Sequence, residues 1–261
     1  GIFTPEILSV CHKILHYSLR NQLIPAFNEK KNYLLSYDEN VICAIKKFQS
    51  IVLSHLEFYV VPNIKMLKDS GLPDSRIVWL LRAHPMIFIT SLDRFAEIVG
   101  EIKEMGLNPS QKNFVSAICV MRKLRKFTWK KKFDVYEKWG WSEEETLVAF
   151  GKYPLVMMCS EKKIMEMMDF YINKMRWDSS SVANHPVLIS LSLEKRVIPC
   201  CSVLRVLLSK GLIRLTSLAT SLKIFEELFL HKFVMPYGEE APNLLRLYQE
   251  KLNVAKCEAR R

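Results

Sequence analysis

The residues of this chain that could do chemistry are lysines and arginines, and they gather in one stretch near the middle. Between Arg122 and Lys138, eight basic side chains stand against Asp134 and Glu137, a local net charge of +6. Such a cluster can neutralise the phosphates of a nucleic acid, which makes binding dependent on salt and largely independent of base sequence. Our first candidate nucleic-acid contacts are therefore Arg122, Lys123, Arg125, Lys126, Lys130, Lys131 and Lys132.

These side chains cannot all serve one surface. Lys130, Lys131 and Lys132 are consecutive, so on a helix they point ~100° apart and only part of the run can face one groove. The alternative for any one of them is an ordinary solvated position. A second candidate group recurs eight to ten residues after two prolines that mark repeated units, at Lys162, Lys163, Lys195 and Arg196.

The whole chain is also basic. It has 38 Lys and Arg against 27 Asp and Glu, a net charge of +11 and a pI near 9.3. This excess favours attraction to polyanions, either nucleic acid or an anionic membrane. No apolar run approaches the ~18 residues of a membrane span, so we expect no membrane partner.

Other kinds of site find no support in the sequence. None of the 8 glycines lies in a phosphate-cradling motif, and the seven cysteines form no CxxC pair. The cysteines are typical of a reduced protein core. His84 and His185 each precede a proline at the same repeat position, which favours a turn role over a ligand role. We therefore expect no catalysis, cofactor, metal or small-molecule substrate.

Three tryptophans offer a possible second kind of contact. Trp129, Trp139 and Trp141 could stack on exposed bases, as aromatic side chains do in proteins that bind single strands. Helical repeats more often bury such side chains between units, and we favour that interpretation.

The elements that position these residues follow a repeat. Ala83-His84-Pro85-Met86-Ile87-Phe88 returns as Lys152-Tyr153-Pro154-Leu155-Val156-Met157 and as Asn184-His185-Pro186-Val187-Leu188-Ile189. The prolines are 69 and 32 residues apart. About six units of roughly 35 residues fit this spacing if one copy has lost its proline. We call each proline-containing turn, which ends one helix and aims the next, a corner.

The clearest unit predicts a helix over 74–83, a corner at Pro85 and a second helix from near Ser91. In that second helix, Leu92, Phe95, Val99 and Ile102 form one apolar stripe, and Gly106 ends it. The next unit begins with a helix over 114–120 and has no proline near Cys119. Ser142 to Glu145 forms a capping box that begins the following unit. No segment alternates with period two, so we expect no strand.

The two ends of the chain carry separate expectations. We take residues 1–261 as one repeat array whose N-terminus is truncated, because Gly1 is not a methionine and the first residues already look like part of a repeat. His12 and Gln49 occupy the proline position in the first two units. Residues 225–261 are expected to form helices that cap the end of the stack.

Several landmarks recur in register and carry a resemblance to a known family. They include Val61-Pro62-Asn63-Ile64, Trp139-Gly140-Trp141-Ser142 and Ser160-Glu161-Lys162-Lys163-Ile164. With the corners, they resemble the repeats of the mitochondrial transcription termination factor (mTERF) family, in its land-plant organellar branch. The sequence departs from that pattern at His12, Gln49 and near Cys119, which lack the proline, and at Arg176, which stands where a glycine would end a unit.

The resemblance implies a right-handed all-helical superhelix curved into a half ring, with nucleic acid on a basic concave face. It also implies a monomeric regulator of gene expression in mitochondria or chloroplasts, delivered by a transit peptide. The leading function is binding to double-stranded DNA with a role in transcription termination. Binding to organellar RNA for splicing or processing, and a scaffold for protein partners, stay open as alternatives.

Overall fold

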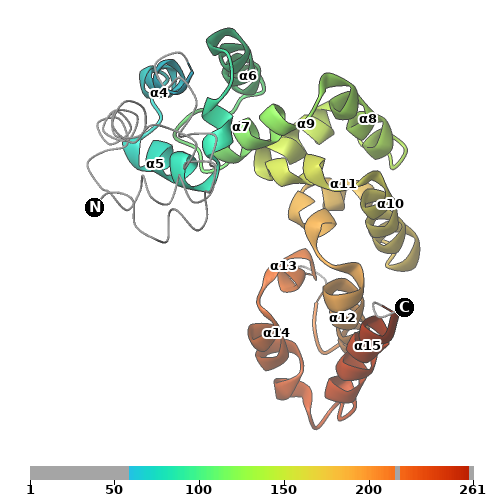
Figure 1. Cartoon of the computed structure of the whole chain (residues 1–261). Helices are drawn as coiled ribbons and strands as arrows, with labels where there is room; N and C mark the ends of the chain where they lie inside the picture. Colours follow the sequence, from blue (N-terminus) through green and yellow to red (C-terminus); the bar gives the residue numbers. More distant parts are fainter. Residues whose placement is uncertain (1–58, 215–217, 259–261) are drawn as a thin grey trace, which may run out of the picture. The chain divides into compact units, whose positions relative to one another are not determined.

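The computed structural model describes residues 59–214 and 218–258, and every regular element in these two ranges is helical (Figure 1). The all-α class with repeated helical units is thereby confirmed. The expectations for His12 and Gln49 lie outside the described residues. Contacts within the chain divide it into two compact units, residues 1–125 and 126–261.

The described part of the N-terminal unit contains two successive pairs of helices. α4 contacts α5, η4 and α6, and α7 packs against α6 and η4. The elements are α4 (Val60–Asp69), α5 (Asp74–Ala83), the 3₁₀ turn η4 (Pro85–Phe88), α6 (Leu92–Glu104) and α7 (Phe114–Lys123).

The C-terminal unit continues the pattern and ends with three helices, α13, α14 and α15, that each contact α12 (Figure 1). Its first elements are α8 (Lys126–Glu137), α9 (Glu143–Lys152), the 3₁₀ turn η5 (Pro154–Met158), α10 (Glu161–Asp169) and the π-helical η6 (Phe170–Lys174). There follow α11 (Ser179–Ala183), the 3₁₀ turn η7 (Pro186–Ser190), the π-helical η8 (Leu193–Val197) and α12 (Ile198–Ser209). The last are α13 (Leu218–Lys223), α14 (Glu226–Phe233), the 3₁₀ turn η10 (Met235–Tyr237) and α15 (Leu244–Glu258).

Each of the three repeated prolines is the first residue of a 3₁₀ turn. The residue before it has a non-helical backbone, with φ of −141° at His84, −153° at Tyr153 and −129° at His185 and ψ between 55° and 84°. The proline ring excludes helical geometry from that preceding residue, so the first helix of the unit stops there. The corner then leads into the second helix.

The fourth unit has no corner at all. Cys119 lies buried in the middle of α7, and only Leu124 and Arg125 separate α7 from α8. The helix that the sequence predicts over 114–120 is confirmed, and it continues to Lys123. Without a proline the first helix runs on through this region, and the unit is shortened by about the length of the 3₁₀ turn.

Second helices end in a left-handed residue. Gly71, Gly106, Gly140 and Gly211 have φ between 69° and 87°, the conformation glycine adopts without steric cost. Arg176 takes the corresponding place after η6 with φ of 57°, so the sequence departure at this position leaves the turn geometry intact.

We expect Arg176→Gly to raise the free energy of unfolding by about 0.5–1 kcal/mol. A left-handed non-glycine residue costs ~1–2 kcal/mol, and the entropy that glycine loses on folding offsets part of the gain. Urea denaturation measures the difference. Glu166→Gly, on the exposed side of α10, is the control and should lower stability by about 1 kcal/mol. A loss of stability in Arg176→Gly would contradict the strain argument.

The core follows the predicted stripe of α6 with one exception. Phe95, Val99 and Ile102 are buried, but Leu92 is 43% exposed. It is the first residue of α6, where the chain has only just left the corner and the side chain still lies outside the packed face. The predicted capping box forms as expected: the Ser142 Oγ accepts from the Glu145 N–H, and Glu145 accepts from the Ser142 N–H.

Candidate nucleic-acid interface

The carbonyl groups that close each corner need partners from outside the turn, since the end of a short helix leaves acceptors unpaired. A side chain from the second helix of the preceding unit supplies the donor in all three described corners. Asn63 Nδ2 donates to the carbonyls of Phe88 (3.0 Å) and Thr90 (2.8 Å). The Lys132 Nζ lies 2.6 Å from the Cys159 carbonyl, and the Lys163 Nζ lies 2.7 Å from that of Ser190. We call these contacts corner clamps.

Two arginines make related bonds. Arg122 donates from Nε to the Thr90 hydroxyl (2.5 Å) and from its terminal nitrogen to the Ile89 carbonyl (3.3 Å). Arg196 donates to the carbonyls of Leu222 (3.1 Å) and Ile224, and its guanidinium lies over a phenylalanine ring. Four of the eleven candidate contacts, Arg122, Lys132, Lys163 and Arg196, therefore bond to neighbouring backbone or hydroxyl groups of the same chain.

Lys132 is the most enclosed of these four, with 5% of its surface exposed. Burial lowers the pKa of its ammonium, because removing water disfavours the charged form, while the nearby Glu161 carboxylate opposes that shift. Its charge-assisted bond to the Cys159 carbonyl compensates for lost hydration. We infer that Lys132 joins two successive repeats and does not contact a ligand.

The seven remaining candidates are exposed. Lys126 and Lys130 are four residues apart on α8 and share one of its faces, while Lys131 lies with its Nζ 4.7 Å from the centre of the Phe127 ring. Lys162 makes a loose pair with Glu166 at 3.8 Å. The full exposed set is Lys123, Arg125, Lys126, Lys130, Lys131, Lys162 and Lys195.

The tryptophans are used in packing. Trp141 is 2% exposed and stacks on Tyr136 with ring centres 4.5 Å apart. Trp139 donates its indole N–H to the Met165 sulfur, and Trp129 packs edge-on against Phe150. Trp141 is buried and Trp129 and Trp139 are half-buried against neighbouring side chains, an arrangement that favours packing over base stacking.

The tyrosine beneath that stack also reaches a corner. The Tyr136 hydroxyl donates to the Val156 carbonyl at 3.0 Å, and in the next unit the Tyr171 hydroxyl donates to that of Leu188 at 3.3 Å. Tyr171 stacks on Trp177 as Tyr136 does on Trp141. Sequence reasoning missed this pairing. The only signal for it was a tyrosine followed five or six residues later by a tryptophan.

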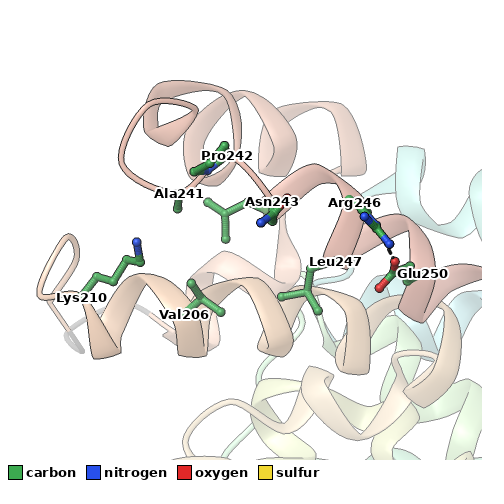
Figure 2. A pocket seen from close by; sticks show the side chains of 9 residues that line it. Val206, Lys210, Ala241, Pro242, Asn243, Arg246, Leu247 and Glu250 are labelled. Atoms are coloured by element: carbon green, nitrogen blue, oxygen red, sulfur yellow. Dashed lines mark hydrogen bonds and ion pairs between the residues drawn. The ribbon is translucent and has the colours of Figure 1, made fainter.

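Two cavities in the described part of the C-terminal unit lie near charged side chains. One of about 430 Å³ lies between α12 and α15, where Val206 and Lys210 face Ala241 to Leu247 (Figure 2). At its edge Arg246 is paired with Glu250 at 2.8 Å, and Lys210 donates to the Glu240 carbonyl. A second, of about 390 Å³, lies beside α8 and is lined by Trp129, Phe133 and Trp141 together with carboxylates. Neither brings the candidate cations together.

Within the described ranges, no group of three or more His, Cys, Asp or Glu side chains is arranged to hold a metal ion. Cys119, Cys200 and Cys201 are buried and Cys159 is half-buried, and all four are free thiols. Burial raises the pKa of the Cys119 thiol to about 11 and those of Cys200 and Cys201 to about 12. None of the helices described is both long and apolar enough to cross a bilayer.

Comparison with known proteins decides the family. The mTERF family model matches residues 5–230. The chain belongs to the mTERF family. No curated protein matches it. The match includes the three corners, the clamps and the exposed cations, and it ends within α14.

Membership gives the coarse function of the chain. mTERF proteins are nucleic-acid-binding regulators of organellar gene expression and are not known as enzymes. For an mTERF protein, exposed cations on repeated helices are the expected means of holding a polyanion.

Proposed function

We propose that this protein binds double-stranded DNA through its exposed basic side chains and regulates transcription, including its termination, in mitochondria or chloroplasts. One observation carries the proposal: in a chain of the mTERF family, seven of eleven candidate cations are exposed while the other four are bonded within the fold. The exposed cations supply the charge that phosphate contacts need.

We also propose that residues 1–261 act as one continuous, monomeric array. The family match crosses the boundary between the two compact units, which supports this view. In the C-terminal unit, α15 packs on α12, as a helix that caps the last repeat would.

The test is a binding series with the purified chain. A random DNA duplex, a single-stranded RNA and a structured RNA are titrated at several salt concentrations. We expect the duplex to bind with Kd of about 1–100 μM or tighter at physiological salt, and affinity to fall steeply as salt rises. Kd weaker than about 10 μM for all three at low salt would overturn the proposal. Tighter binding to either RNA than to the duplex would favour the RNA-processing alternative.

A further inference from the structure

Three consecutive repeats of the C-terminal unit each carry two adjacent basic residues. The pairs are Lys131–Lys132, Lys162–Lys163 and Lys195–Arg196. In every pair the second residue donates to a backbone carbonyl about 27 residues further along the chain, at Cys159, Ser190 and Leu222 respectively. The second residues are therefore committed to holding the next repeat.

The first residue of every pair is exposed. The Lys162 side chain has 85% of its surface accessible, and Lys131 and Lys195 are exposed as well. Neighbouring helical residues point ~100° apart, so fixing the second residue inward turns the first one outward. The clamp thus sets the direction in which its neighbour presents its ammonium group.

In two repeats a serine N-cap holds the backbone of the pair, through the N–H of the second residue in one repeat and of the first residue in the other. Ser160 caps its helix by accepting from the Lys163 N–H, and Ser192 accepts from the Lys195 N–H, both at 3.2 Å. Lys162 and Lys195 therefore lie in the first turn of their helices, next to a fixed cap.

We propose that Lys131, Lys162 and Lys195 each contact a backbone phosphate of the bound nucleic acid, so that each of the three repeats supplies at least one contact, while their clamped neighbours set the spacing between these three contacts. This inference rests on the proposed function and names the residues that carry it. The ligand chemistry is the phosphate group, which carries no base information, so the three contacts give affinity and register but no sequence specificity.

The spacing between repeats is compatible with this arrangement. α8 contacts α10 directly, and helices that pack together lie ~8–10 Å apart. Duplex DNA rises ~3.4 Å per phosphate along one strand. Successive repeats would then meet about every third phosphate.

The test compares two triple variants of the full chain. In the first, Lys131, Lys162 and Lys195 are changed to Gln. In the control, Lys174, Lys232 and Lys251, which are exposed on η6, α14 and α15, are changed to Gln. The net charge falls by the same amount in both. The readouts are melting temperature and the slope of log K against log salt, for a random duplex and for a single-stranded RNA.

We expect the duplex slope of the first triple to flatten by about 2.7, because each lost contact removes about 0.9. The slope on the single strand should flatten by about 2. The control should change by less than 1 on either probe, and neither triple should change its melting temperature. Equal slopes in the two triples, with binding retained, would overturn this inference and leave the proposed function standing. Failure of the unmodified chain to bind any probe would overturn both this inference and the proposed function.

A variant of Lys163, the second residue of its pair, separates the clamp role from phosphate contact. Lys163→Met should lower the melting temperature by about 5 °C, since it leaves the Ser190 carbonyl without its donor, and it should leave the salt slope unchanged. Lys163→Arg should keep most of the stability. A flattened salt slope with an unchanged melting temperature in Lys163→Met would show that the second residue also contacts phosphate. It would overturn the proposal that the first residue of each pair contacts phosphate while the second holds the next repeat.

Discussion

Replacing Tyr136 with alanine is expected to lower the free energy of unfolding by about 3–5 kcal/mol, the usual cost of removing a fully buried aromatic ring. Tyr136 is 0% exposed, stacks on Trp141 and donates its hydroxyl to the Val156 carbonyl of the next corner. The substitution removes the packing within one repeat and a bond to the following one. Urea denaturation followed by circular dichroism measures the loss.

Two variants distinguish the contributions to this effect. Tyr136→Phe keeps the ring and removes only the hydroxyl, so it should cost about 1–2 kcal/mol for an unpaired buried carbonyl. Tyr171→Ala removes the equivalent ring in the next repeat and should cost as much as Tyr136→Ala. A loss below 1 kcal/mol in Tyr136→Ala would show that the stacked pair does not hold the repeats together.

Reversing the charge of the exposed cations in the basic stretch is expected to weaken duplex binding more than 100-fold at about 0.1 M salt. The variant changes Lys123, Arg125, Lys126 and Lys130 to Glu. Four lost phosphate contacts should flatten the salt slope by about 3–4, and the new carboxylates add repulsion. Arg122 is left unchanged because it bonds to Ile89 and Thr90. Fluorescence anisotropy across a salt series measures both quantities.

The matched control reverses four exposed lysines elsewhere, Lys103, Lys112, Lys174 and Lys232, and so changes the net charge equally. Long-range attraction should weaken in both variants, and the slope should flatten strongly only in the first. If both lose affinity and slope to the same extent, the basic stretch is not a contact surface and total charge alone drives association.

Much of the fold could be predicted from local rules. A proline beyond the first turn ends the helix before it, and a serine followed by glutamate three residues later begins one, so the corner at Pro85 and the cap at Ser142 required no tertiary information. Helix α5 has the bounds that the sequence predicts, Asp74 to Ala83. Arg176 shows the limit of such rules. Its side chain disfavours a left-handed backbone, yet the residue adopts one because its place in the repeat requires it.

The roles of the basic residues could be predicted only in part. The 100° step between helical neighbours indicates that Lys130, Lys131 and Lys132 must diverge, and the structure leaves the first two exposed and buries the third. Which of them turns inward depends on a carbonyl 27 residues away, at Cys159. Composition and periodicity do not indicate where that acceptor lies. The sequence therefore cannot distinguish the buried clamp residues from the exposed cations.

The corner clamps also decide how this array could be recombined. Each donor and its acceptor belong to successive repeats, as with Lys163 and the Ser190 carbonyl. A repeat transplanted from the start of its first helix to the end of its second helix would lose both clamps. The donor in its second helix would be separated from the next corner, and its own corner carbonyl would be separated from the donor in the preceding repeat. The exchangeable module therefore runs from one second helix through the following corner, and chimeras joined between a corner and the second helix that follows it should keep every clamp intact.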